Sequence, residues 1–392
     1  MGVDLHKETH TAVMLDCWNQ KLGEITFDNK PSEFSKLTRK VSRFVTEEKT
    51  AVYGLENAYG YGRTLAVWLI EKGNMVKDVN TALSYAQRKS VPMYQKSDSY
   101  DAEAVALVLI NMLDRLPDAI PDDKYWTLSQ LVNRRDNICT HQSRLKNQFH
   151  EQLCAAYPSY KQFFGDISRV TALYFFMKYP SPEHLRGKMA EEVAEELRPV
   201  SHNNCSVKRA EKILNLIQSD GETQREHQET RDAITRSLAR DLEHYRVQLK
   251  EVEKAIEMML PQFHCTLMTM PGIDVIMAAN MLSEIGDINR FLNASKLAKF
   301  AGIAPVNFSS AGKGKDMCPK QGNRRLQAIF YFMAIQISTN GMPRNKVFRE
   351  YYLKKVEDGK NKQQALICIA RCLVNIVYGM LKNRTEYREP EQ

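Results

Sequence analysis

The first hundred residues alternate between short apolar, β-branched runs and helical patterns, and this alternation constrains the fold more than any other feature. Residues 2–16, GVDLHKETHTAVMLD, suit a hairpin or two adjoining strands, and residues 50–62, TAVYGLENAYGYG, form an apolar run that leads into a glycine-rich turn. The segment RTLAVWLIEKG is typical of a helix that stops at Gly73, and NMVKDVN follows as another strand. Strand, helix and strand in this order predict an α/β sheet with parallel members.

Helical spacing of the apolar residues begins at Asp98 and extends to about residue 175, and residues 205–260 form a longer helical stretch. In that stretch apolar residues step by threes and fours with charges between them, which predicts the seam of a coiled coil or helical hairpin. We expect a spacer or a dimerisation arm. The residues of this seam are Ile234, Leu238, Leu242, Tyr245, Leu249, Val252, Ile256 and Met259.

A third region begins near residue 264 with a pattern typical of a helix-hairpin-helix, in which Pro271 and Gly272 occupy the turn. Such hairpins present backbone amides to phosphates, and a plain helical pair is the alternative. A polar, glycine-rich loop follows, and then a helix from about Asn323. A chain of 392 residues with 43% hydrophobic content can bury more than one core. We therefore expect three domains: residues 1–120, 121–262 and 263–392.

Composition excludes several classes of protein. The formal net charge of +8 favours anionic partners. The eight cysteines include no CxxC pair and no histidine at ligand spacing, which argues against a zinc site or a disulfide framework and predicts reduced thiols in a cytoplasmic protein. The sequence also shows no signal peptide and no apolar run of membrane length, so we expect no membrane partner.

Four acidic residues stand at positions that suggest a shared site. Asp98 and Asp101 lie three apart at the head of a predicted helix, where acids are favoured by the helix dipole and where Ser97 or Asp98 would cap the first turn. Asp4 and Glu56 each interrupt an apolar strand. Four converging carboxylates repel one another unless cations neutralise them, and Mg²⁺ prefers carboxylate oxygens. The arrangement predicts phosphoryl transfer with two metal ions.

The segment from Arg290 to Arg325 carries eight basic residues and a single acid, Asp316, so we expect a polyanion to bind there. Ser309 and Ser310 lie within it and are either turn residues, part of a phosphate-binding loop, or a nucleophile whose attacked phosphate is neutralised by neighbouring lysines. The basic residues of this segment are Arg290, Lys296, Lys299, Lys313, Lys315, Lys320, Arg324 and Arg325.

A second basic stretch lies on the predicted helix over residues 126–150, where Arg134, Arg135, Arg144 and Lys146 stand beside apolar positions. This face is either a nucleic-acid contact or a solvated charged face. We find no predicted helix rich in asparagine, glutamine and arginine at base-reading positions, so the expected contacts are to phosphates.

These motifs occur in one order along the chain: GVDLHK with Asp4, GLENAYGYG with Glu56, QKSDSYDAEAVA with Asp98 and Asp101, and the block GIAPVNFSSAGKGK with KQGNRRL. In this order they resemble the DEDD transposases of bacterial insertion sequences, a family that includes the pilin-gene invertase Piv. The resemblance covers the first 110 residues and residues 264–385. The departures are Ser97, where threonine is usual, and the start of the chain close to Asp4.

The resemblance implies a RuvC-like, ribonuclease-H-type fold for the N-terminal domain, with Asp4, Glu56, Asp98 and Asp101 as its metal site. It also implies a mostly α-helical C-terminal transposase domain with a nucleophilic serine, which falls on Ser310 with Ser309 as the second choice. Many members of this family are guided by a structured noncoding RNA. The implied partners are therefore donor and target double-stranded DNA, a guide RNA and further copies of the same chain.

We thus expect a site-specific DNA recombinase that mobilises an insertion sequence, with two Mg²⁺ ions as cofactor and a phosphoserine intermediate that makes ATP unnecessary. The acids and the serine at opposite ends of the chain suggest a composite site. The alternatives are an RNA-independent invertase of the Piv type, a RuvC-like nuclease or resolvase that uses water, and a non-catalytic binding or scaffolding protein.

Overall fold

A computed structural model describes residues 1–46, 49–90, 97–201, 205–304, 306–310, 313–317, 322–338 and 345–389, with the backbone alone for 306–310 and 313–317. The chain divides into two compact units, Met1–Thr127 and Leu128–Gln392.

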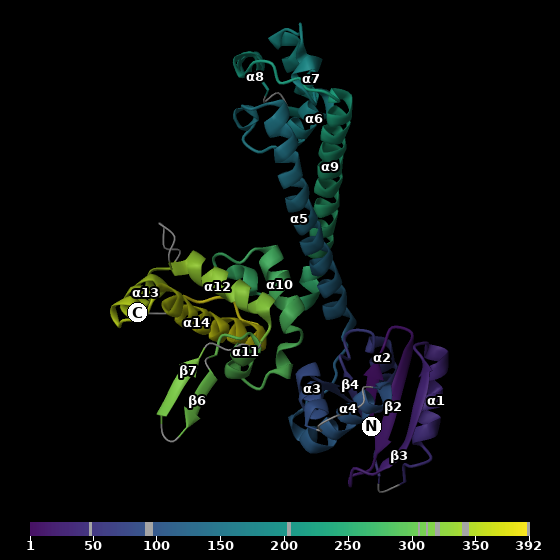
Figure 1. Ribbon diagram of the computed structural model, residues 1–392. Coiled ribbons are helices and arrows are strands. Elements are labelled where there is room, and N and C mark those ends of the chain that lie inside the picture. The colour runs from purple at the N-terminus through teal and green to yellow at the C-terminus, as the bar shows by residue number, and fades with distance from the viewer. Residues whose placement is uncertain are drawn as a thin grey trace. The chain divides into compact units, whose positions relative to one another are not determined.

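The first unit contains a five-stranded sheet in the order β3-β2-β1-β4-β5 (Figure 1). The predicted adjoining strands are β1 (Gly2–Leu5) and β2 (Thr9–Leu15), which pair antiparallel. The predicted parallel members are β4 (Val52–Glu56) and β5 (Met75–Val79), and β4 pairs parallel with both β1 and β5. The predicted mixed α/β sheet is therefore confirmed. Sequence reasoning missed β3 (Lys21–Asp28), which pairs antiparallel with β2 at the edge of the sheet.

Helices cover both faces of this sheet. The core on one face joins Val3 to side chains of α1 (Pro31–Val41) and α2 (Arg63–Glu71), and α2 stops before Gly73 as predicted. On the other face α4 (Asp98–Met112) packs on β1 and β2, and α3 (Thr81–Lys89) packs beside α4. Successive residues of a strand face opposite sides, so Gly2 and Asp4 face α4 while Val3 faces away.

The close approach of β1 and α4 depends on a glycine. A Cβ atom at Gly2 would overlap the carbonyl oxygen of Ala102 and the backbone nitrogen of Ala106. Glycine therefore allows the helix backbone to lie directly on the strand. This contact carries the first turn of α4 to the end of β1, where Asp4 lies.

Two long helices dominate the first part of the second unit and lie side by side (Figure 1): α5 (Asp123–Ala156), which starts in the first unit, and α9 (Gln228–Met259). They run antiparallel, because Arg134 of α5 bonds to Gln248 and His141 packs on Tyr245. Of the predicted seam residues, Leu238, Leu242 and Ile256 are buried, whereas Ile234 is 43% exposed. The coiled-coil packing itself stays a prediction.

The segment between α5 and α9 folds around a cluster of aromatic side chains, and we call this segment the head. The head consists of η2 (Tyr160–Gln162), α6 (Val170–Lys178), η3 (Pro182–Leu185), α7 (Ala190–Ser201) and α8 (Val207–Asp220). Phe149 of α5 and Phe176 of α6 meet edge to face with ring centroids 5.6 Å apart. The cluster also includes Tyr157, Phe163 and Phe175.

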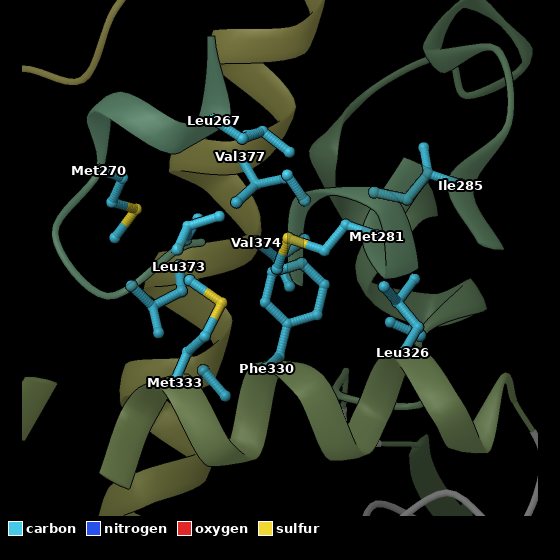
Figure 2. Packing of buried hydrophobic residues seen from close by; sticks show 14 of the residues in the cluster. Leu267, Met270, Met281, Ile285, Leu326, Phe330, Met333, Leu373, Val374 and Val377 are labelled. Atoms are coloured by element: carbon cyan, nitrogen blue, oxygen red, sulfur yellow. The ribbon is translucent and has the colours of Figure 1, made fainter. Parts of the chain in front are cut away.

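The C-terminal part of the second unit is a helical core formed by α10 (Val275–Ile285), α11 (Ala294–Phe300), α12 (Arg324–Ser338), α13 (Lys346–Glu357) and α14 (Lys362–Asn383). Figure 2 shows Phe330 of α12 pointing between Met281 of α10 and Val374 of α14. By length and composition α14 could cross a membrane. Its residues Ile369, Leu373 and Val377 are, however, buried in this core.

Two local predictions differ from the structure in this part. The predicted first helix before Pro271 is a single 3₁₀ turn, η5 (Leu267–Thr269), and only the second helix, α10, forms. The predicted glycine-rich loop instead contains an antiparallel hairpin of β6 (Val306–Ser310) and β7 (Lys313–Met317). Its register pairs Ser310 with Lys313 and leaves two residues between the strands, which is the commonest length of a hairpin connection.

Candidate active site

The first unit brings the four predicted acids together. The parallel strands β1 and β4 pair Val3 with Leu55, so Asp4 and Glu56 follow at the same end of the sheet. The other three acids lie close enough to Asp4 to change its pKa. Burial raises the pKa of Asp4 above its ordinary value, nearby His6 lowers it, and the carboxylates of Asp101, Asp98 and Glu56 raise it further. We call these four residues the acid cluster.

The start of α4 explains why two aspartates can serve this cluster. Ser97 is the N-cap, and its side chain accepts a hydrogen bond from the Tyr100 backbone nitrogen at 3.2 Å. Neither aspartate is therefore needed as the cap. Asp98 and Asp101 lie three apart and share one side of the helix, where the positive end of the dipole favours them. The Asp98 side chain is 60% exposed and that of Asp101 is 13% exposed.

A histidine that sequence reasoning did not select completes one half of the cluster. His6 Nε2 lies 3.0 Å from Asp4 Oδ2 and 3.5 Å from Asp98 Oδ1. One ligand atom from each of Asp4, His6 and Asp98 falls within 4.8 Å of the others, which is close enough for a shared metal ion. The signal was present in the sequence, because residues two apart in an extended segment share a side.

An arginine completes the other half. Arg88 of α3 lies with Nη1 3.4 Å from Glu56 Oε2 and with Nε 3.5 Å from Asp101 Oδ1. The Tyr100 hydroxyl donates to the Arg88 carbonyl oxygen at 3.2 Å and ties α3 to the start of α4. No motif marks Arg88 in the sequence, since its role depends on how α3 packs on α4.

The acid cluster has more negative charge than its neighbours satisfy. Asp4 Oδ2 and Asp101 Oδ1 are both buried, and among the described residues neither accepts a well-aligned hydrogen bond. His6 Nε2 and Arg88 Nε approach them only as ion-pair contacts, at 3.0 and 3.5 Å. Buried carboxylate oxygens are costly without a partner or a coordinated cation. Oxygen ligands suit Mg²⁺, and the imidazole of His6 also suits transition metals such as Mn²⁺. The residues present therefore fit a divalent cation.

The predicted serine lies on the hairpin of the second unit. Ser310 ends β6 and pairs in register with Lys313, Ser309 pairs with Gly314, and Phe308 pairs with Lys315. The backbone thus sets Ser310 and a lysine directly opposite each other on neighbouring strands. The side chains of Ser309, Ser310, Lys313 and Lys315, and all of Lys320, lie outside the described residues.

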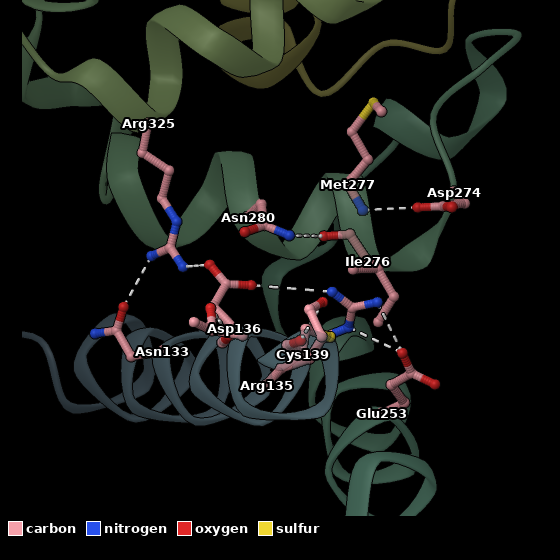
Figure 3. Close-up of polar contacts among 12 residues, drawn as sticks. Asn133, Arg135, Asp136, Cys139, Glu253, Asp274, Ile276, Met277, Asn280 and Arg325 are labelled. Carbon is pink, nitrogen blue, oxygen red and sulfur yellow. Dashed lines mark hydrogen bonds and ion pairs between the residues drawn. The ribbon is translucent and has the colours of Figure 1, made fainter. Parts of the chain in front are cut away.

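Two arginines predicted to bind nucleic acid have carboxylate partners within the second unit (Figure 3). Arg325 of α12 donates to Asn133 at 2.8 Å and to Glu284 at 3.0 Å, and it forms an ion pair with Asp136. Burial lowers the pKa of the Arg325 guanidinium below its ordinary value. We call these four residues the Arg325 network.

The other side chains predicted to contact nucleic acid differ in their partners and in their exposure to solvent. Arg135 pairs with Glu253 of α9 at 2.9 Å (Figure 3). Arg134 bonds to Gln248 of α9, and Arg324 bonds to Gln327 on its own helix at 2.8 Å. Arg144 is exposed and Lys146 is half-buried. Their role in binding nucleic acid stays a prediction.

Comparison with known proteins places these features in a family. A family model described as a transposase matches residues 1–158, and a second, described as the transposase IS116/IS110/IS902 family, matches residues 265–353. The first match spans the whole acid cluster. The second match includes β6, β7 and all of α12.

Relatives that match most of this chain agree with these family matches. An uncharacterized 44.8 kDa protein of insertion element IS116 from Streptomyces clavuligerus is 25% identical over 98% of this chain and 94% of its own length. An uncharacterized 43.6 kDa protein of insertion element IS110 from Streptomyces coelicolor is 26% identical over 80% of this chain and 79% of its own length. A pilin gene-inverting protein from Moraxella lacunata is 22% identical over 99% of this chain and 97% of its own length.

Two family matches in the order found along the chain, each over the region where the motifs lie, agree with the predicted resemblance. Members of this family typically depend on a divalent metal, which the acid cluster fits. The chain belongs to the IS116/IS110/IS902 family of transposases, enzymes that cleave DNA and transfer its strands.

Proposed function

We propose that this transposase cuts DNA with Mg²⁺ held by Asp4, Glu56, Asp98 and Asp101 on a ribonuclease-H-like, RuvC-type domain. The observation that carries the proposal is the acid cluster, in which four carboxylates converge and two of their buried oxygens accept no well-aligned hydrogen bond among the described residues. The sheet order β3-β2-β1-β4-β5, with three antiparallel strands followed by two parallel ones, supports the ribonuclease-H-like assignment.

Each residue of the site has a distinct part in this proposal. Asp4 and Asp101 are largely buried and fix the position of the site, whereas Asp98 is exposed and faces the substrate side. His6 and Arg88 balance part of the negative charge. Bound divalent cations supply activation of the attacking oxygen and stabilisation of the leaving oxygen, and we propose two ions.

Metal binding is tested without any DNA. Mg²⁺ should raise the melting temperature of the protein, because a ligand that binds only the folded state stabilises it. Asp4→Asn should abolish this shift. Arg88→Gln should enlarge it, because the cluster then lacks a competing cation, and Lys89→Gln removes the same charge from the next residue of α3 and should change nothing. A shift that persists in Asp4→Asn would contradict the metal assignment.

We further propose that the Ser310 hydroxyl attacks the scissile phosphate. The new bond joins Ser310 Oγ to phosphorus, one ester oxygen of the DNA leaves as a hydroxyl and takes up a proton, and a DNA hydroxyl later reverses the exchange on a new strand. The covalent bond conserves the energy of the phosphodiester, so no ATP is consumed. The pairing of Ser310 with Lys313 in the hairpin supports the choice, since a lysine next to the attacked phosphate would neutralise its charge.

The serine assignment is tested by trapping the adduct. Labelled DNA carrying the element's ends should form a covalent complex with the wild-type protein and with Ser309→Ala, but not with Ser310→Ala. If Ser309→Ala alone loses the adduct, the nucleophile is Ser309. If both variants still cleave without any adduct, the enzyme is a metal-dependent nuclease or resolvase that uses water.

We also propose that a structured guide RNA selects the donor and target DNA, in an assembly of more than one copy of the chain in the cytoplasm. The predicted contacts suit phosphates, so sequence choice must come from base pairing. Protein expressed with its native flanking DNA and treated with nuclease should retain a discrete RNA. The pilin gene-inverting relative favours a second candidate, an RNA-independent invertase. Strong preference of RNA-free protein for one DNA sequence would support that candidate instead.

A further inference from the structure

The head of the second unit contains a hollow of about 380 Å³ whose lining includes two lysines and one histidine. Lys146 and His150 lie four residues apart on α5 and share one side of that helix. Lys161 enters from η2, and the segment from Phe164 to Ile167 forms the opposite wall. Lys146 is the predicted nucleic-acid contact on α5 that lines this hollow.

The two lysines of this hollow form no ion pair with the described carboxylates. Lys161 Nζ lies 6.0 Å from the centre of the Tyr160 ring, and the acid that lines the hollow, Asp166, is bonded elsewhere. Asp166 Oδ1 accepts hydrogen bonds from the Ser168 backbone nitrogen at 2.9 Å and from the Ser168 hydroxyl at 2.6 Å. The hydrogen bond from the Ser168 side chain is the main cause that lowers the pKa of Asp166, and the charges of Lys146 and Arg169 lower it further.

His150 shows that the two lysines converge. Its Nδ1 lies 2.7 Å from the Tyr160 hydroxyl, which fixes the ring at the wall of the hollow. Burial lowers the pKa of His150 below its ordinary value, and the charges of Lys161 and Lys146 lower it further. Both lysines are therefore within electrostatic reach of one half-buried ring.

A second hollow borders the same segment. It measures about 150 Å³, and its lining includes Arg169 and Arg209. Arg209 is held in place, because Nε and Nη2 donate to the Phe163 carbonyl oxygen at 3.2 and 3.0 Å and its guanidinium lies 5.4 Å from the Phe164 ring centre. The two hollows share Phe164, Gly165 and Asp166 as a common wall.

We propose that these two hollows form one binding site for the phosphodiester backbone of a nucleic acid. Together the hollows present four cationic side chains, two lysines and two arginines, against one carboxylate, that of Asp166. Concave surfaces with an excess of one sign of charge focus the electrostatic field and attract a ligand of the opposite sign. A chain of phosphates offers the repeated negative charge that two neighbouring basic hollows require, and backbone contacts of this kind position a nucleic acid without reading its sequence. The site goes beyond the cleavage chemistry and rests on the proposed function only for its choice of ligand.

The test measures binding of a fluorescent single-stranded RNA and of a duplex DNA of equal length to the RNA-free full-length protein, over a range of salt concentrations. The test variant is Lys146→Gln with Lys161→Gln. The matched control is Lys208→Gln with Lys212→Gln, which removes two exposed lysines of α8 that line neither hollow. Melting temperatures confirm that both double variants fold.

Each lost phosphate contact lowers the slope of log affinity against log salt by about 0.7 for single strands and about 0.9 for duplex DNA. The test variant should therefore lower the slope by about 1.4 with RNA or about 1.8 with DNA. The control variant should lower the slope by less than the loss of one contact would, about 0.7 with RNA or about 0.9 with DNA. The nucleic acid whose slope changes is the ligand. Unchanged slopes with both, or equal changes in test and control, would overturn the proposal, while a covalent adduct that still depends on Ser310 would leave the proposed function intact.

Discussion

The acid cluster of the first unit and the Arg325 network of the second both gather charged side chains from segments far apart in the sequence, but they differ in balance. In the Arg325 network, two carboxylates, Asp136 and Glu284, share the Arg325 guanidinium. Asp136 also lies 3.9 Å from a second guanidinium, that of Arg135, and Glu284 accepts a further bond from Asn323 at 2.6 Å. The acid cluster gathers four carboxylates around one arginine, Arg88, and one histidine, His6, which carries a charge only when it is protonated.

This difference separates a structural network from a site that is built for a ligand. A balanced set of charges satisfies itself and contributes to folding, whereas an excess of one sign is tolerated only where something else supplies the opposite charge. Substitutions in the two clusters should therefore have opposite effects on stability and activity.

The largest expected effect comes from neutralising one buried acid. Asp4→Asn and Asp101→Asn should each lower DNA cleavage by about 10²- to 10³-fold, because a group that stabilises the transition state is lost. The same variants should keep or raise the melting temperature of the metal-free protein, because repulsion and desolvation at a buried carboxylate are relieved. A cleavage assay on labelled DNA and calorimetry measure the two effects. A lower melting temperature with cleavage retained would show that the acid cluster, like the Arg325 network, serves stability rather than catalysis.

Removing the arginine of the balanced network should act in the opposite way. Arg325→Met leaves Asp136 and Glu284 without their cation and should cost about 3 kcal/mol of unfolding free energy, the lower end for a broken buried ion pair, because the Arg325 side chain is partly exposed. Arg324→Met, at the exposed neighbouring position, is the matched control and should cost far less. Denaturant titration measures both, and equal losses would show that the network is not a stabilising unit.

The third prediction concerns the packing that assembles the acid cluster. Gly2→Ala would place a Cβ against the α4 backbone at Ala102 and Ala106, and overpacking of this kind costs about 2 kcal/mol. Because α4 carries Asp98 and Asp101, the shift should also lower cleavage. Gly23→Ala in the same sheet meets Met14 Cε at 3.4 Å, an ordinary contact, and should leave cleavage unchanged. Wild-type cleavage by Gly2→Ala would mean that the cluster does not depend on this contact.

The sequence predicted the sheet and the meeting of the four acids because both follow from short-range patterns. Strand periodicity placed Asp4 and Glu56 at strand ends, and parallel neighbours end at the same edge. His6 and Arg88 were missed for different reasons. His6 follows from strand alternation once Asp4 is chosen, but Arg88 meets Glu56 and Asp101 only through the packing of α3 on α4, which no local pattern encodes.

The same limit explains the nucleic-acid contacts. Charge runs predicted Arg135 and Arg325 as exposed cations, but a sequence cannot show that Glu253 of α9 and Glu284 of α10 lie beside them. The hairpin at β6 and β7 was predicted as a loop, because its glycines and lysines hid the two short strands that pair across a two-residue connection.

The smallest expected effect tests whether the cap of α4 serves the acid cluster or only the helix. Ser97→Ala removes the hydrogen bond to the Tyr100 nitrogen and should cost about 1 kcal/mol, the usual loss for a serine cap. Ser206→Ala removes the equivalent cap of α8, whose side chain accepts from the Arg209 nitrogen, in a helix that carries none of the four acids. Both variants should lose similar stability in denaturant titrations. Only Ser97→Ala should also weaken the Mg²⁺-dependent rise in melting temperature, because Asp98 and Asp101 stand on the turn that the cap fixes. An equal Mg²⁺ response in the two variants would show that the first turn of α4 holds its aspartates in place without the cap.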